Sequence, residues 1–113
     1  IIRSPNGREY RMTKQEIENL VNEHRVVLFM KGSRDAPQCG FSMKAVKMLE
    51  ILGAEYETCN VLADENLRQN IKEYSEWPTI PQLYVNGEFQ GGCDIMTDMF
   101  HDKSLAEVLN AEN

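Results

Sequence analysis

The feature that most constrains the fold of this chain is an unbroken apolar run, Val-Val-Leu-Phe-Met, over residues 26–30. A strand with one solvated face alternates apolar and polar residues, whereas a strand buried on both faces is apolar throughout. The run therefore predicts a buried strand in a sheet with helices packed on it, which is the α/β class. A chain of 113 residues is long enough to build one such domain around a hydrophobic core.

Helical and strand patterns alternate along the rest of the chain. Apolar spacing, stop signals and capping residues, with capping boxes at Thr13/Glu16 and Ser104/Glu107, predict helices over residues 13–24 and 40–52, and others beginning at Asp64, Cys93 and Ser104. Further strands are predicted over residues 54–61, 82–85 and 88–90, the last two joined in a hairpin by Asn-Gly at 86–87. This order predicts a four-stranded mixed sheet flanked by helices.

Charge and cysteine content exclude several classes of partner and compartment. The net charge of −6 argues against a nucleic-acid surface, because phosphate contacts need clustered Lys and Arg. No apolar stretch approaches the roughly 20 residues needed to cross a bilayer. The three cysteines, Cys39, Cys59 and Cys93, are widely spaced and odd in number, unlike those of a secreted disulfide scaffold. We therefore expect a reducing compartment, functional thiols, and neither nucleic acid nor membrane as a partner.

Cys39 has the sequence context of a reactive thiol. It lies where a predicted strand has ended and a predicted helix begins, so free amides and the positive end of the helix dipole can stabilise a thiolate there. Lys31, at the end of the preceding strand, can add a positive charge beside the same sulfur. The alternative is that Cys39 is a small buried residue, as most free cysteines are.

The residue three positions later, Ser42, decides which chemistry Cys39 can perform. A second cysteine there would resolve a mixed disulfide within the motif, whereas a serine hydroxyl is not a competent nucleophile for this exchange at neutral pH. A lone thiolate still binds metal, but a [2Fe–2S] cluster needs four ligands. Two copies of the chain would supply two, so the other two must come from a diffusible thiol such as glutathione.

Four segments in register resemble the monothiol glutaredoxins of the CGFS type, in their single-domain bacterial and organellar form. These segments are Lys31, Cys39-Gly40-Phe41-Ser42, the Trp-Pro-Thr-Ile-Pro run at 77–81, and the Gly-Gly-Cys-Asp run at 91–94. The resemblance covers the chain from about residue 13 to the C-terminus. It implies a thioredoxin-like (glutaredoxin) fold over residues 13–113. Residues 1–12 show no clean periodicity, and we expect them to form a flexible N-terminal arm.

The resemblance implies that basic residues bind one end of glutathione. Lys31 would contact the glycine carboxylate, helped by Arg68 and Lys72 from the helix that follows Asp64. Arg68 and Lys72 lie one helical turn apart, and a solvated charged face is the alternative meaning of that spacing.

The resemblance also implies contacts for the rest of the tripeptide and for iron. The backbone of Ile80, before a Pro81 expected to be cis, would pair with glutathione as an added strand does. The Cys93 backbone and Asp94 would bind the γ-glutamyl end, since helix-start amides and a carboxylate together suit a group that carries both charges. The Cys39 sulfur would ligate iron.

Three residues near these segments also have other interpretations. Trp77 is expected to pack at the base of its loop rather than contact ligand, and Cys59 is expected to be structural. Cys93 could form a disulfide with Cys39 when no cluster is bound. This disulfide is a hypothesis that a Cys93→Ser variant tests, because it should abolish that intramolecular product on oxidation.

The function implied is glutathione-dependent binding of a [2Fe–2S] cluster by a homodimer, and its transfer to apo iron–sulfur proteins. BolA-like proteins are further expected partners. The alternative function is an enzyme, a thiol–disulfide oxidoreductase that removes glutathione from proteins through Cys39 alone. The resemblance and the absence of an initiator Met favour the mitochondrial matrix. Bacterial or eukaryotic cytoplasm and plastid are the alternative compartments.

Overall fold

The computed structural model describes residues 12–110, and the predicted arm over residues 1–12 lies outside this range except for Met12. Met12 itself is buried and packs in the core. In chain order, the elements are α1 (Lys14–Glu23), β1 (Val26–Met30), α2 (Gly40–Ile51), β2 (Glu57–Asn60), η1 (Val61–Ala63), α3 (Glu65–Ser75), β3 (Gln82–Val85), β4 (Glu88–Gly91), α4 (Cys93–His101) and α5 (Ser104–Asn110). None of the helices in this range is long and apolar enough to span a membrane.

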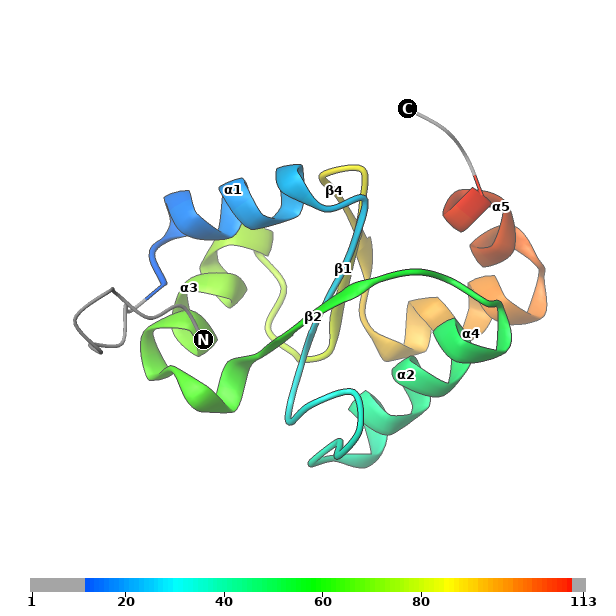
Figure 1. Cartoon of the computed structure of the whole chain (residues 1–113), viewed down its shortest axis with the longest axis horizontal. Coiled ribbons are helices and arrows are strands. Elements are labelled where there is room, and N and C mark those ends of the chain that lie inside the picture. Colours follow the sequence, from blue (N-terminus) through cyan, green and yellow to red (C-terminus); the bar gives the residue numbers. More distant parts are fainter. Residues whose placement is uncertain (1–11, 111–113) are drawn as a thin grey trace.

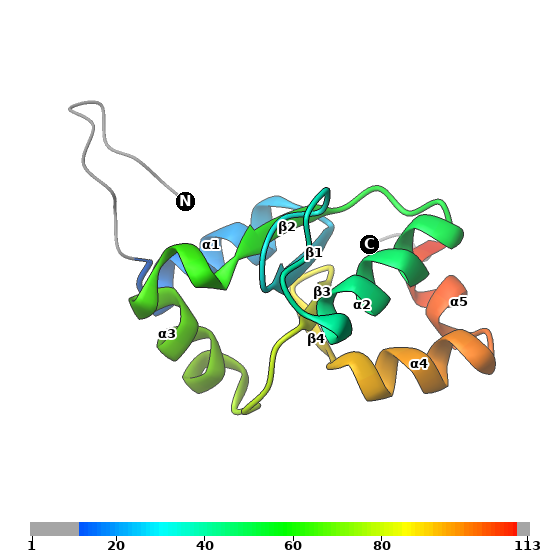
Figure 2. The same ribbon diagram turned by 90° about the horizontal axis from the view of Figure 1, so that it is seen from below.

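The four strands form one mixed sheet, as predicted, and their order in it is β2-β1-β3-β4. Strand β1 runs parallel to β2 and antiparallel to β3, and β3 and β4 form the antiparallel hairpin that Asn86-Gly87 predicted. Helices α1 and α3 cover one face, and α2, α4 and α5 cover the other (Figures 1 and 2). Some predicted bounds are wrong: β2 spans Glu57–Asn60 rather than residues 54–61, β4 ends at Gly91 rather than residue 90, and α2 ends at Ile51 rather than residue 52.

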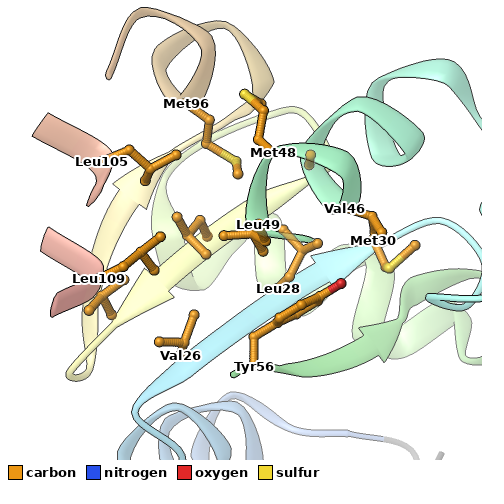
Figure 3. Packing of buried hydrophobic residues seen from close by; sticks show 13 residues of the cluster. Val26, Leu28, Met30, Val46, Met48, Leu49, Tyr56, Met96, Leu105 and Leu109 are labelled. Carbon is orange, nitrogen blue, oxygen red and sulfur yellow. The ribbon is translucent and has the colours of Figure 1, made fainter. Parts of the chain in front are cut away.

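Strand β1 is buried on both faces, which confirms the prediction from its apolar run. Its residues Val26, Leu28 and Met30 pack with α2, α4 and α5 in one core cluster (Figure 3). The alternate residues Val27 and Phe29 pack with α1 and α3 in a second cluster. The two clusters explain why this strand has no polar position.

The predicted helix starts are correct at α1 and α3 and wrong in detail at α5. Thr13 and Glu16 form the predicted capping box, and Asp64 is the N-cap of α3. Ser104 does not form a capping box with Glu107, because it lies inside α5 as the first helical residue. Its backbone amide donates instead to the Asp102 carboxylate at 2.8 Å, so the carboxylate takes the capping role.

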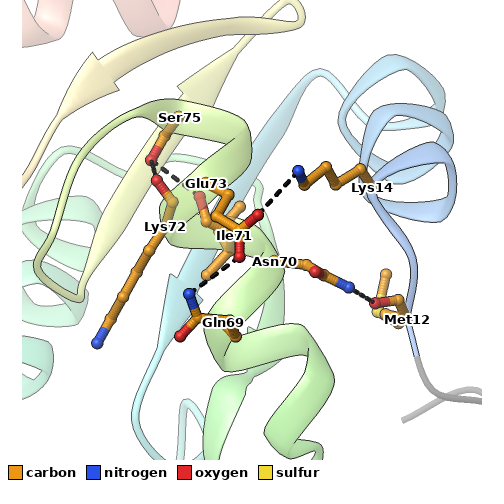
Figure 4. A network of polar contacts seen from close by, with 8 residues as sticks. All are labelled: Met12, Lys14, Gln69, Asn70, Ile71, Lys72, Glu73 and Ser75. Atoms are coloured by element: carbon orange, nitrogen blue, oxygen red, sulfur yellow. Dashed lines mark hydrogen bonds and ion pairs between the residues drawn. The ribbon is translucent and has the colours of Figure 1, made fainter.

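Polar contacts fix α3 against the start of the described chain (Figure 4). Asn70 donates to the Met12 carbonyl at 2.8 Å, and the Met12 amide donates to the Asp64 carboxylate at 2.7 Å. Lys14 and Glu73 form an ion pair at 2.9 Å between α1 and α3. In Figure 4 the Lys72 side chain extends away from these contacts with Met12 and Lys14.

Candidate functional site

Cys39 is the N-cap of α2, at the loop-to-helix junction that the sequence predicted. Its backbone is extended and its Sγ accepts a hydrogen bond from the Ser42 amide at 3.3 Å. A sulfur in this position takes the place of the oxygen that usually caps a helix, and it meets the positive end of the helix dipole. These contacts stabilise the thiolate, and because the residue is half-exposed, the sulfur is also accessible.

Ser42 contacts the Cys39 sulfur directly, a role that the sequence reasoning missed. Its side chain is fully buried, with an exposed fraction of 0%. Its Oγ accepts a hydrogen bond from the Lys31 backbone amide at 3.0 Å and lies 3.3 Å from Cys39 Sγ. Because the Lys31 amide already donates to this oxygen, the hydroxyl proton can point to the sulfur when the thiol ionises. The sequence did contain a signal for this contact, because the side chain of an N-cap residue usually bonds the amide two or three positions later, which is here that of Ser42.

The electrostatic environment favours the thiolate of Cys39. Partial burial alone would raise the pKa of this thiol, but hydrogen bonds from Ser42 and the Phe41 amide, with the charge of Lys31, lower the pKa below its ordinary value. The other described α-helices each carry an acidic residue in the first turn, whereas α2 carries none. A carboxylate there would compete with the sulfur for the same amides and raise its pKa.

Replacing Ser42 by alanine should raise the pKa of Cys39. Only the thiolate is alkylated, so the pH midpoint of alkylation should move upward and the rate at pH 7 should fall by on the order of tenfold, the effect of losing one hydrogen bond to a charged group. Iodoacetamide labelling followed by mass spectrometry, at a series of pH values, measures both. Ser104→Ala on α5 is the matched control. An unchanged midpoint in Ser42→Ala would show that the hydroxyl does not act on the sulfur.

The loop before Cys39, residues 31–38, is fixed by contacts with Asn60 at the end of β2 and with Tyr56, which immediately precedes that strand. Gly32 donates its amide to Asn60 Oδ1 at 2.9 Å, and the Arg34 guanidinium lies 4.0 Å from the Tyr56 ring centre and donates to the Tyr56 carbonyl. Gly32 has φ +91, and a Cβ there would come within 2.5 Å of the Ala36 carbonyl oxygen, so only glycine fits this turn. These contacts fix Lys31 relative to Cys39.

A pocket of about 310 Å³ lies beside the sulfur and collects most of the predicted site residues. Its lining residues come from the end of β1, the start of α2, α3, the loop before β3 and the start of α4; they are Lys31, Phe41, Lys72, Trp77, Pro78, Thr79, Ile80, Pro81, Gly92, Cys93 and Asp94. Of the seven predicted site residues, Arg68 and Cys39 are not in this lining. Arg68 lies one turn before Lys72 on α3, and Cys39 lies close enough to Lys31 and Cys93 for their charges to interact.

Trp77 and Pro81 both line the pocket. The Ile80–Pro81 peptide bond is cis, as expected. The Trp77 ring lies 5.6 Å from the Phe89 ring centre, which confirms that it packs at the base of its loop, yet it also lines the pocket. A Cβ at Gly92 would come within 2.9 Å of Trp77 Nε1, so a glycine at this position allows the loop to approach α4 closely.

The other two cysteines differ from Cys39 in exposure and acidity. Cys59 is buried, and burial raises its pKa to about 11, so it is the structural residue that was predicted. Cys93 is also buried, and burial raises the pKa of its thiol as well. All three thiols are free in this structure, and the Cys39–Cys93 disulfide stays a prediction.

A second hollow, of about 450 Å³, lies at the opposite end of β1. Its lining includes His24, Arg25, Glu55 and Asn110 but none of the predicted site residues and no cysteine. Although it is larger, its lining contains no thiol, so we take the pocket beside Cys39 as the candidate functional site.

The fold is that of a thioredoxin-like protein, and the candidate site lies beside a cysteine sulfur that caps a helix. The family model described as Glutaredoxin matches residues 26–90. A protein of Synechocystis sp. named uncharacterized monothiol glutaredoxin ycf64-like is 55% identical over 97 residues, which cover 86% of this chain and 91% of that protein. The chain therefore belongs to the glutaredoxin family, and within it to the monothiol glutaredoxins.

The names of the relatives of this chain indicate more than one compartment. The Arabidopsis thaliana protein named bifunctional monothiol glutaredoxin-S16, chloroplastic, is 50% identical over 96% of this chain, which spans only 39% of that longer protein. The Lachancea kluyveri protein named monothiol glutaredoxin-5, mitochondrial, is 52% identical over 86% of this chain and 70% of its own length. These names do not single out one compartment, and the mitochondrial matrix stays a prediction.

Solved structures confirm the fold. A truncated monomeric mutant of Trypanosoma brucei 1-C-Grx1 superimposes with a TM-score of 0.79, at 43% identity, over 88% of this chain and 91% of that one. A buckwheat glutaredoxin, solved as a complex with glutathione, gives a TM-score of 0.76 at 25% identity over 85% of this chain and 86% of that one.

Proposed function

We propose that this protein carries a [2Fe–2S] cluster as a homodimer and transfers it to apo iron–sulfur proteins. One Cys39 thiolate from each protomer and two glutathione thiolates would be the ligands. The observation that carries this proposal is the pairing of an accessible, stabilised thiolate with a buried serine where a second thiol of the motif would lie. The motif keeps a soft metal ligand and lacks the thiol that would resolve a disulfide.

The supply of ligands supports sharing of the cluster between two chains. Among residues 12–110, no three His, Cys, Asp or Glu side chains gather to hold a metal ion. A [2Fe–2S] cluster takes four ligands, usually thiolates. One protomer offers Cys39, so a symmetric pair offers two, and a small thiol has to complete the set.

The pocket beside Cys39 has the chemistry to hold glutathione, whose two carboxylates and one ammonium group need both signs of charge. Lys31 and Lys72 would bind the glycine carboxylate, with Arg68 a predicted helper from the preceding turn of α3. The backbone of Ile80 would pair with the peptide, and the start of α4 would bind the γ-glutamyl group through the Cys93 amide and the Asp94 carboxylate. The N-cap of α4 is Gly92, which has no side chain to bond the first amides of the helix, and this supports a role for those amides in binding the ligand.

Anaerobic reconstitution with iron and sulfide, with and without glutathione, tests the proposal. We expect visible absorption and a dimeric mass in solution only when glutathione is present. If the protein forms no cluster with glutathione, or forms it equally well without any small thiol, the proposed ligand set is wrong.

The second candidate function is removal of glutathione from protein thiols, which the half-exposed Cys39 thiolate favours. Its sulfur would attack the glutathione sulfur of a mixed disulfide and release the protein thiolate. A second glutathione thiolate would then attack the Cys39–glutathione bond, restoring Cys39 and releasing glutathione disulfide. Steady-state turnover on a mixed disulfide at rates typical of dithiol glutaredoxins would make this the main function. BolA-like proteins, which the family resemblance implies as partners, would accompany either function.

A further inference from the structure

We infer that Gln82 is a positioning residue, which fixes the loop at residues 77–81 in the conformation that receives the tripeptide. This inference rests on the proposed binding of glutathione. Gln82 is the first residue of β3, and it is buried and does not line the pocket itself, so it would act through the loop.

The Gln82 side chain makes three hydrogen bonds beneath the loop. Its Nε2 donates to the Trp77 carbonyl at 3.1 Å and to the Thr79 carbonyl at 3.2 Å. Its Oε1 accepts from the Tyr84 hydroxyl at 3.4 Å. The amide therefore uses both of its N–H groups on the backbone of the same loop, and Tyr84 fixes which end of the amide faces that loop.

The burial of Gln82 indicates that these bonds matter. In the described range, two polar side chains are buried, Ser42 and Gln82, and both are 0% exposed. A buried amide is costly unless it is hydrogen-bonded, and an apolar side chain would fill the same space without that cost. Each of these two side chains lies beneath a different half of the site. Ser42 contacts the sulfur, and Gln82 contacts the loop.

The loop at residues 77–81, which Gln82 contacts, is the part of the pocket lining whose backbone groups can bind a ligand. With the Trp77 and Thr79 carbonyls bonded to Gln82, the loop is fixed from its inner side. No hydrogen bond of the Ile80 backbone is found among residues 12–110, and Ile80 lines the pocket. A preformed loop binds more tightly because less conformational freedom is lost on binding.

Gln82→Leu tests this role, because leucine fills much of the space and donates to neither carbonyl. The Thr79 carbonyl then loses the bond from Gln82, and the Trp77 carbonyl keeps only the long bond from the Ser75 hydroxyl at 3.5 Å. We expect glutathione affinity, measured by calorimetry, to fall by about tenfold, as for one or two lost buried hydrogen bonds. Trp77 is the single tryptophan of the chain, so acrylamide quenching of its fluorescence should increase even without ligand. The pH midpoint of Cys39 alkylation should not change, because α2 holds the sulfur independently of the loop.

Gln82→Glu gives a second test in a nearly isosteric variant. A protonated carboxyl can still donate one hydrogen bond to the loop, whereas a carboxylate would repel both carbonyls. Glutathione affinity in this variant should therefore fall as pH rises through the titration of the new carboxyl group, over a range where the parent affinity is level. The low-pH form keeps the test usable if the leucine variant fails to fold.

The matched control is Gln15→Leu, an exposed glutamine on α1 whose side chain bonds only within its own helix. It should leave all three measurements unchanged. Unaltered affinity and quenching in both Gln82 variants would overturn the inference, as would an equal shift in Cys39 reactivity, which would indicate general loosening. If the parent protein itself fails to bind glutathione, the proposed function fails, and the Trp77 quenching alone then decides whether Gln82 orders the loop.

Discussion

Replacing Cys39 by serine is expected to abolish the visible absorption that we expect the parent protein to gain on reconstitution with glutathione. A serine hydroxyl stays protonated at neutral pH and cannot take the place of a thiolate ligand to iron. The fold should survive, because serine is a favoured N-cap and its oxygen can accept from the same Ser42 amide. Absorption spectra of the parent and variant, with circular dichroism to confirm folding, make the measurement.

The other two cysteines provide the controls for this prediction. Cys59→Ala and Cys93→Ser should both retain the cluster, because Cys59 lies buried in a core cluster and Cys93 is expected to act through its backbone. A Cys39→Ser protein that still gave the parent spectrum, or a Cys93→Ser protein that lost it, would show that the wrong sulfur has been assigned to iron.

The largest effect on stability is expected from Phe29→Ala in β1. Phe29 is fully buried, and its ring meets the Tyr84 ring edge-on at 5.6 Å between centres. Truncation of a buried aromatic residue costs about 3–5 kcal/mol, while a domain of this size has a total stability of about 5–15 kcal/mol. Urea denaturation followed by circular dichroism should therefore show a much lower midpoint.

Phe41→Ala is the matched control, since the same side chain is removed from a position that is 64% exposed. Its free energy of unfolding should stay within about 0.5 kcal/mol of the parent value. Similar losses from the two substitutions would mean that the burial of β1 does not dominate the stability of this fold.

Much of the fold could be predicted because its strongest signals are local. The apolar run at 26–30 identified the central strand, Asn86-Gly87 identified the hairpin, and Thr13 with Glu16 identified the first helix start. The failure at α5 has a local cause as well. The sequence analysis placed the cap at Ser104, whereas the left-handed backbone of Lys103 (φ 73) brings the Asp102 carboxylate to the Ser104 amide.

The parts of the site that could not be predicted depend on contacts between residues far apart in the chain. Ser42 meets the Lys31 amide across 11 positions, and Arg34 meets Tyr56 across 22. No local pattern signals such pairs, since they exist only once the sheet has formed. The choice between Arg68 and Lys72 depends on the rotation of α3 about its axis, and a spacing of one turn does not determine that rotation.

The alternation of β1 side chains between two core clusters has a consequence for how the molecule comes apart. If α1 and α3 detached, Val27 and Phe29 would become exposed, and the same strand would then support the opposite layer less well. Neither layer can melt without weakening the other, so heat or denaturant should disrupt both in a single cooperative transition. The amide hydrogens of β1, paired on both sides within the sheet, should be among the last to exchange with deuterium.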